Sequence, residues 1–342
     1  MGILDWFLNR PAQFDPDRVK DETVRRSTEK AIALTNPRLQ VLPSSHSRLA
    51  PAVETTIDFL RRLIDDLPGV RRLSTGDWAT DPAWRAFFAA PADIPAMLGR
   101  ADNLRTLFEK YPALDEAYLL LGMAFSEQRV LGVALQGGIM QRDVVQTSVS
   151  FSDHRMPVCG RNETRLRRLI GVEAFEYLLS VALNEIGRDR AERQELEANR
   201  ALIRARLRLF QQQGPGLGSL FGDVPAAKSE QERLEAELLE NERQLQMLGG
   251  NESVLEMELD CLKEVLDNPH RYLNVEQVSL RLNAMNVVLD EASPEHAADV
   301  GFSLVELSGS PPVRRAFVLA RVARGEFPSS PAINFADAAR YL

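Results

Sequence analysis

The chain has 342 residues, enough for two or three domains at about 150 residues each. Its 41 basic and 49 acidic residues give a formal net charge of −8, which argues against a protein that coats nucleic acid with a basic face. The 44% hydrophobic content is sufficient for a buried core, and the glycine and proline contents exclude collagen-like and low-complexity classes. Most basic residues are arginines, a bias typical of a GC-rich bacterial genome.

Residues 1–126 are predicted to form a helical N-terminal domain with proline-marked joints. Asp15 and Pro16 suit the N-cap and first turn of a helix that runs to about Thr35. Apolar residues at three- and four-residue spacings predict a second helix over Leu49–Leu67. Further helices are predicted at Asp81–Phe88, Ile94–Lys110 and Leu114–Phe125, and we expect Trp84, Phe87 and Phe88 in the core.

Two segments, 127–160 and 269–327, show the two-residue period of half-buried strands. In the first, strands are predicted at Val130–Leu135, Ile139–Met140, Val145–Phe151 and Met156–Cys159. In the second, Val278–Ala284 alternates, and Phe302–Leu307 with Arg315–Val322 predicts a β-hairpin. We expect the two segments to form one small antiparallel β base.

Residues 161–268 are predicted to form a long antiparallel coiled-coil hairpin inserted into that base. An uninterrupted helix over Glu163–Gln213 would extend about 75 Å, which is too long for a helix without a coiled-coil partner. After a tip loop at 214–228, an a/d seam follows at four- and three-residue spacings, in which Asn241 would fix the register. The seam consists of Leu234, Leu238, Asn241, Leu245 and Leu248.

Charge favours pairing of the two arms within one chain. The first arm carries Arg200, Arg204 and Arg208, and the facing stretch of the second is rich in glutamate, with Glu242 expected near Arg200. The alternative is one long helix that dimerises between chains. The expected fold class is therefore α+β and predominantly α, with a helical domain, a β base, a coiled-coil arm and a C-terminal tail at 328–342.

Two apolar segments are the predicted partner-binding sites. The tip loop contains Leu217, Leu220 and Phe221, which we expect to lie at the end of the arm. The N-terminal decapeptide contains the other predicted contact residues, which are Ile3, Leu4, Trp6 and Phe7. A second interpretation places the decapeptide in a lipid interface, and a third docks it onto its own domain.

No catalytic, cofactor-binding or metal-binding residue is predicted. Asp153, His154 and Cys159 lie within seven residues, but too few cysteines and histidines accompany them for a structural zinc site, and we interpret them as turn residues. The glycines of the tip loop lack the lysine spacing of a nucleotide loop. The basic clusters at 165–168 and 314–315 could contact phosphates, but we predict a solvated face or internal ion pairing.

The function predicted from these features is a non-catalytic scaffold or adaptor subunit of a bacterial multiprotein assembly. It would contact other proteins through the arm tip and the N-terminal peptide, without cofactors and without nucleic acid. Two cysteines, no apolar run of about 18 residues and no signal peptide predict a cytoplasmic protein. The alternatives are a peripheral membrane protein and an enzyme with a site between the helical domain and the β base; homo-oligomerisation is compatible with each.

Overall fold

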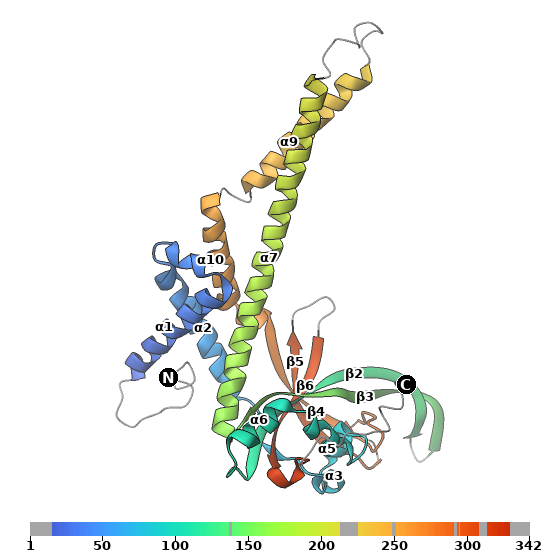
Figure 1. The fold of residues 1–342 in the computed structure, drawn as a ribbon. Helices are drawn as coiled ribbons and strands as arrows, with labels where there is room; N and C mark the ends of the chain where they lie inside the picture. Colours follow the sequence, from blue (N-terminus) through green and yellow to red (C-terminus); the bar gives the residue numbers. More distant parts are fainter. Residues whose placement is uncertain are drawn as a thin grey trace, which may run out of the picture. The chain divides into compact units, whose positions relative to one another are not determined.

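The computed structural model describes residues 16–136, 139–212, 225–247, 251–290, 293, 295–307 and 313–328. Helix outweighs strand in these residues, which confirms a mixed and predominantly helical α+β fold. The described chain divides into two compact units (Figure 1): unit 1 combines residues 16–19, 57–175 and 269–328, and unit 2 combines 20–56 and 176–268. Residues 57–126 therefore group with the strands, and the predicted boundary at residue 126 does not coincide with this division.

Unit 1 is built on a sheet with six described strands, whose main path has the order β3-β2-β6-β5-β4. Neighbours along this path are antiparallel, and the short strand β1 pairs with β6 in parallel. The strands are β1 Arg71–Arg72, β2 Glu116–Gln136, β3 Ile139–Gly160, β4 Leu273–Leu282, β5 Ala298–Leu307 and β6 Val313–Ala323. Strand β4 and the pairing of β5 with β6 confirm the strand and the hairpin that the sequence predicts in the second β segment.

Strand β2 shows that the predicted helix over Leu114–Phe125 is wrong. Leu119 and Leu121 pack on one face of the sheet, whereas Leu120 packs on the other. A strand buried on both faces produces a continuous apolar run without the two-residue alternation, so its period resembles that of a buried helix. The short strands predicted between residues 130 and 159 belong to one long hairpin of β2 with β3.

The core of unit 1 lies between the sheet and short helices that follow one another along the chain. These helices are α3 Asp77–Thr80, α4 Pro82–Phe87, α5 Asp93–Gly99 and α6 Asp102–Lys110. Trp84, Phe87 and Phe88 are fully buried, as predicted. The ring of Phe87 meets that of Phe151 edge-on at 4.8 Å between centroids, and Phe151 meets Phe302 at 5.4 Å. Such aromatic pairs join the helices to the sheet.

The single helix predicted over Ile94–Lys110 is wrong, because the segment forms two helices, α5 and α6. The chain leaves the helical path after Gly99, and the guanidinium group of Arg105 donates a hydrogen bond of 2.8 Å to the Gly99 carbonyl oxygen. This bond satisfies one of the carbonyl groups that a helix leaves free at its C-terminus. Two 3₁₀ helices, η3 Pro269–Arg271 and η4 Arg324–Glu326, complete the elements of unit 1.

Unit 2 is helical in its described part. Its elements are α1 Pro16–Thr35, η2 Pro37–Val41, α2 Ser45–Asp65, α7 Glu163–Gln212, α9 Pro225–Met247 and α10 Asn251–Asp267. The start of α1, the end of α2 and the start of α7 belong to unit 1. Helices α1 and α7 agree with their predicted spans almost to the residue. The reason is local: proline marks the first turn of α1, and no strong helix breaker lies inside α7.

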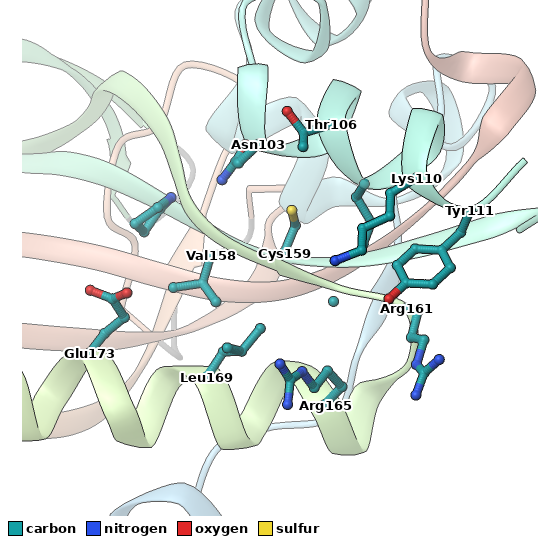
Figure 2. A pocket seen from close by; sticks show the side chains of 13 residues that line it. Asn103, Thr106, Lys110, Tyr111, Val158, Cys159, Arg161, Arg165, Leu169 and Glu173 are labelled. Carbon is teal, nitrogen blue, oxygen red and sulfur yellow. The ribbon is translucent and has the colours of Figure 1, made fainter. Parts of the chain in front are cut away.

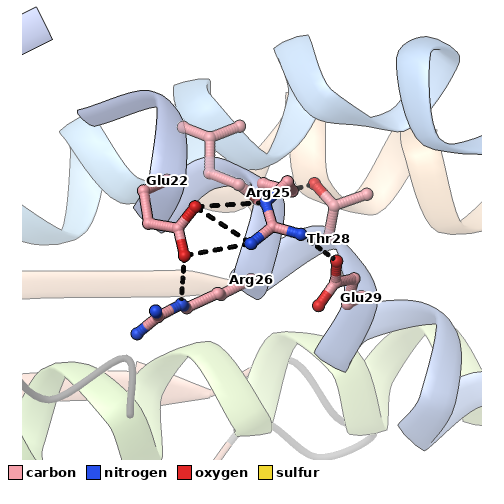
Figure 3. Close-up of polar contacts among 6 residues, drawn as sticks. Glu22, Arg25, Arg26, Thr28 and Glu29 are labelled. Carbon is pink, nitrogen blue, oxygen red and sulfur yellow. Dashed lines mark hydrogen bonds and ion pairs between the residues drawn. The ribbon is translucent and has the colours of Figure 1, made fainter. Parts of the chain in front are cut away.

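The exposed face of α1 carries a network of ion pairs within the helix (Figure 3). Arg25 contacts Glu22 and Glu29, both at 3.0 Å, and Arg26 donates to Glu22 at 2.6 Å. The hydrogen bond from Arg25, together with the charges of both arginines, lowers the pKa of the Glu22 carboxyl. These pairs follow the i, i+3 and i, i+4 spacings that stabilise a helix surface, and they give no indication of a binding site.

Among the described residues of unit 2, one carboxylate is buried, that of Glu258 in α10, whose side chain is 6% exposed. It accepts a hydrogen bond from Arg190 Nε at 2.6 Å and another from Asn36 Nδ2 at 2.5 Å. Burial alone would raise the pKa of Glu258, but the hydrogen bonds from Arg190 and Asn36 outweigh it, and the pKa is lowered. Glu258 thereby links α10 to α7 and to the end of α1 through charge-assisted hydrogen bonds.

Candidate functional site

Helices α7 and α9 contact each other through a small apolar cluster in unit 2. Ile203 and Leu207 of α7 are buried against Leu234 of α9, and Leu238 packs beside them. In Figure 1 the two helices lie side by side, α7 in yellow-green and α9 in gold. The cluster uses one face of each helix, at the four-residue spacing that places side chains on the same face.

One ion pair between the helices shows which residues of α7 and α9 face each other. Arg204 Nη2 lies 2.6 Å from Glu242 Oε1, whereas the sequence placed Arg200 near Glu242. The predicted partner of Glu242 is therefore wrong by one helical turn. The two side chains are 50% and 35% exposed, and a pair of this kind contributes about 0–1 kcal/mol. The apolar cluster therefore contributes more to the contact than this ion pair does.

Asn241 lies on the same face of α9 and is 6% exposed. Its Oδ1 atom is buried and has no hydrogen-bond partner among the described residues. A buried acceptor without a partner costs about 1–3 kcal/mol. Polar residues in helix–helix seams can restrict register, and this role of Asn241 stays a prediction.

A second apolar stripe runs along α7 outside this contact. Leu202 and Leu209 are 51% and 57% exposed. Ala205, between them in the sequence, and Ala198, which precedes Leu202, are also exposed. The four positions follow spacings of four, three and four residues, which align on one face of a helix. We call them the α7 outer stripe. The stripe was not predicted from the sequence, although its four- and three-residue spacings are present there.

The predicted partner-binding residues lie outside the described part of the chain. Leu217, Leu220 and Phe221 of the tip loop and the N-terminal residues Ile3, Leu4, Trp6 and Phe7 are all in undescribed segments. Their roles stay predictions.

The His154 side chain contacts the backbone of Phe87 and the ring of Phe88. Its Nε2 atom lies 2.7 Å from the carbonyl oxygen of Phe87, and its ring stacks on that of Phe88 at 4.5 Å between centroids. Burial lowers the pKa of His154, more than the carbonyl of Phe87 raises it. No hydroxyl or thiol of the described residues is hydrogen bonded to His154. The neighbouring Asp153 pairs with Arg155 and Arg315 at 2.9 and 3.0 Å.

Cys159 is not placed for nucleophilic catalysis or metal binding. Burial raises the pKa of its thiol to about 11, so the thiol carries its proton at neutral pH, whereas a nucleophilic cysteine needs a lowered pKa. Within the described ranges, no group of three or more histidine, cysteine, aspartate or glutamate side chains is arranged to hold a metal ion. Asp153, His154 and Cys159 all lie within strand β3, so their interpretation as turn residues is wrong.

The basic cluster at 165–168 is partly used inside the fold. Arg167 donates to the carbonyl oxygens of Ile64, Leu67 and Pro68 at 2.7 to 3.3 Å, at the C-terminus of α2, and also contacts Glu163 at 2.8 Å. A cation there is favoured by the helix dipole. In the second cluster, Arg315 pairs with Asp153. The expectation of internal pairing is confirmed for these two arginines.

Comparison of the chain with protein-family models, with curated proteins and with solved structures found no significant match. Among the described helices, none combines the length and the apolar character needed to cross a membrane. The function must therefore be argued from the geometry.

Proposed function

We propose that the protein is a non-catalytic adaptor that presents α7 and α9 as an antiparallel coiled-coil arm and docks a partner helix on the α7 outer stripe. The observation that carries the proposal is the exposure of Leu202 and Leu209 at heptad spacing on a helix whose other face already packs against α9. A heptad stripe of this kind is suited to a second helix that supplies its own apolar face.

The chemistry of the stripe defines the partner. Alternating alanine and leucine side chains permit close approach of another helix, so we expect an amphipathic helix with leucine or isoleucine at matching spacings. Burying the exposed halves of Leu202 and Leu209 would supply about 1.5–3 kcal/mol, which corresponds to roughly 10- to 150-fold in affinity. The proposal also includes contacts of the tip loop and the N-terminal peptide with partner proteins.

The test replaces both leucines of the stripe. The variant Leu202→Glu/Leu209→Glu should lose the partner helix, because two charges would be buried in an apolar contact, while its helical circular dichroism stays unchanged. Leu239→Glu is the matched control, since Leu239 of α9 is 71% exposed and lies outside the stripe. A photo-crosslinking amino acid at position 202 should capture the partner, and the same residue at position 239 should not.

Equal recovery of every partner by the wild type and the double variant would refute the proposal. Sedimentation of the purified chain decides whether the partner is a second copy: concentration-dependent dimerisation that disappears in the double variant would identify it as such. The alternative of a membrane anchor at residues 1–10 has a separate test, flotation with lipid vesicles before and after deletion of that peptide. No observation among the described residues favours it over the adaptor.

A further inference from the structure

Unit 1 contains a cavity of about 560 Å³ between α6, the end of β3 and the first turns of α7 (Figure 2). This volume is within the range of about 300–1,000 Å³ that is typical of small-molecule sites. The cavity is independent of the α7 outer stripe, and the adaptor proposal does not use it.

Three cations line the cavity, and they come from separate parts of the chain. They are Lys110 at the end of α6, Arg161 after β3 and Arg165 in the first turns of α7. Figure 2 shows Lys110 and Arg165 on opposite sides of the cavity, with the Tyr111 ring beside Lys110. Lys110 Nζ lies 5.8 Å and Arg161 Cζ 5.6 Å from the centroid of that ring. The aromatic ring helps to hold both cations near one another.

None of these three cations forms an ion pair with a residue that the structure describes. Glu163 is the carboxylate at the start of α7, and it is held by Arg167 at 2.8 Å. Lys110 and Arg161 are exposed and Arg165 is half-buried, so solvent screens their mutual repulsion, and an anion that enters the cavity meets three positive side chains. The cluster thus has the charge that an anionic ligand would balance.

Backbone geometry fixes the distance between strand and helix at this site. A Cβ atom on Gly160 would lie 2.9 Å from the backbone nitrogen of Leu166, so only glycine permits this approach of β3 to α7. The approach places Arg161 and Arg165 on the same cavity. The backbone N–H of Arg165 is already bonded to Asn162 Oδ1 at 2.7 Å, and the positive charge therefore comes from side chains rather than from that helix-terminal amide.

The rest of the cavity is lined by apolar side chains and one carboxylate. Val158 and Leu169 form an apolar wall, and Glu173 lies beyond Leu169 at the far end (Figure 2). Glu173 follows Arg165 by eight residues, which is about 12 Å along the helix. A ligand that fills the cavity would meet cations at one end, apolar side chains in the middle and a carboxylate at the other end.

We propose that this cavity binds a small phosphate monoester, with the phosphate between Lys110, Arg161 and Arg165. Three positive charges and Glu173 leave a net charge of +2, and a phosphate monoester carries about −1.5 to −2 at neutral pH. A monocarboxylate would neutralise only part of that charge. The body of the ligand lies against Val158 and Leu169, and a hydroxyl or amino group donates to Glu173.

The proposal concerns binding and includes no chemical step. The thiol of Cys159, which lines the cavity, carries its proton at neutral pH because burial raises its pKa to about 11. The phosphate would be held by charge-assisted hydrogen bonds, among which arginine forms bidentate pairs.

The experiment measures binding of phenyl phosphate to the full chain by isothermal titration calorimetry. Benzoate, which has the same phenyl ring but a carboxylate in place of the phosphate, is the comparison ligand. We expect phenyl phosphate to bind, and benzoate to bind at least about tenfold more weakly. Lys110→Gln and Arg165→Gln should each weaken phenyl phosphate binding by about tenfold or more, with the fold checked by circular dichroism. Arg129→Gln is the control, because Arg129 is an exposed arginine of β2 outside the cavity.

The pH dependence provides a second readout. Binding of phenyl phosphate should weaken as the pH falls below about 6, where the monoester loses its second charge. Equal affinity in the wild type, in Lys110→Gln and in Arg165→Gln would overturn the proposal, as would the absence of phenyl phosphate binding. Benzoate that binds as tightly as phenyl phosphate would overturn the assignment to phosphate.

Discussion

Replacement of Glu258 by glutamine tests whether a buried carboxylate stabilises the helical interior of unit 2. The glutamine keeps the size of the side chain and one acceptor oxygen but removes the charge. In the wild type, Glu258 accepts charge-assisted hydrogen bonds from Arg190 at 2.6 Å and from Asn36 at 2.5 Å. Such bonds contribute about 1.5–3 kcal/mol each, against about 0.5–1.5 kcal/mol for neutral ones.

The net effect is smaller than this difference suggests. A neutral amide costs less to bury than a carboxylate, and the Arg190 side chain is half exposed, so solvent screens part of its attraction. We expect Glu258→Gln to destabilise local structure by about 1–2 kcal/mol, which corresponds to roughly 5- to 30-fold faster amide exchange. Hydrogen exchange with mass spectrometry on peptides from α1 and α10 measures it. Glu192→Gln, at an exposed position of α7, is the matched control.

The pH dependence distinguishes charge from packing. The folded-state pKa of Glu258 is lowered from 4.5, so its contribution is present above that value and is lost as the pH falls through the folded-state pKa. The difference between wild type and Glu258→Gln should therefore shrink as the pH falls below about 4.5. A difference that stays constant with pH, or a variant as protected as the wild type, would refute the reasoning.

Four further predictions follow from the contacts described above. Asn241→Leu should slow exchange in α9, because it removes an unpartnered buried acceptor that costs about 1–3 kcal/mol; faster exchange would show that the oxygen is satisfied. Arg204→Glu should lower protection of α9 by at most about 1 kcal/mol, and Glu242→Arg in the same chain should restore it; no restoration would contradict the pairing. Phe302→Ala should destabilise unit 1 by about 3–5 kcal/mol in urea unfolding, and a loss under about 1 kcal/mol would contradict its core position. Because its pKa is about 11, Cys159 should react with iodoacetamide about 100-fold more slowly near pH 8 in the native chain than in the unfolded one, and stability should fall as the pH rises above about 9; equal reaction rates would refute the burial of the thiol.

The sequence alone predicted those elements whose boundaries are local. The span of α1 follows from a proline in its first turn, and the span of α7 from the lack of a strong helix breaker. The alternation in β4 and the apolar runs of β5 and β6 also predicted correct strands, because the two-residue period survives where only one face of a strand is fully covered.

Tertiary structure decided the rest, for two physical reasons. Burial on both faces of β2 removed the alternation that would have identified it as a strand. Seam positions recur every three or four residues, about one helical turn, so charge patterns alone left the partner of Glu242 uncertain by one turn. The cavity lined by Lys110, Arg161 and Arg165 depends on the close approach of β3 to α7 at a glycine. Residues that are distant in sequence share a site only once the chain has packed, and no local period encodes that approach. The net charge of −8 is therefore compatible with a cavity whose own charge is positive.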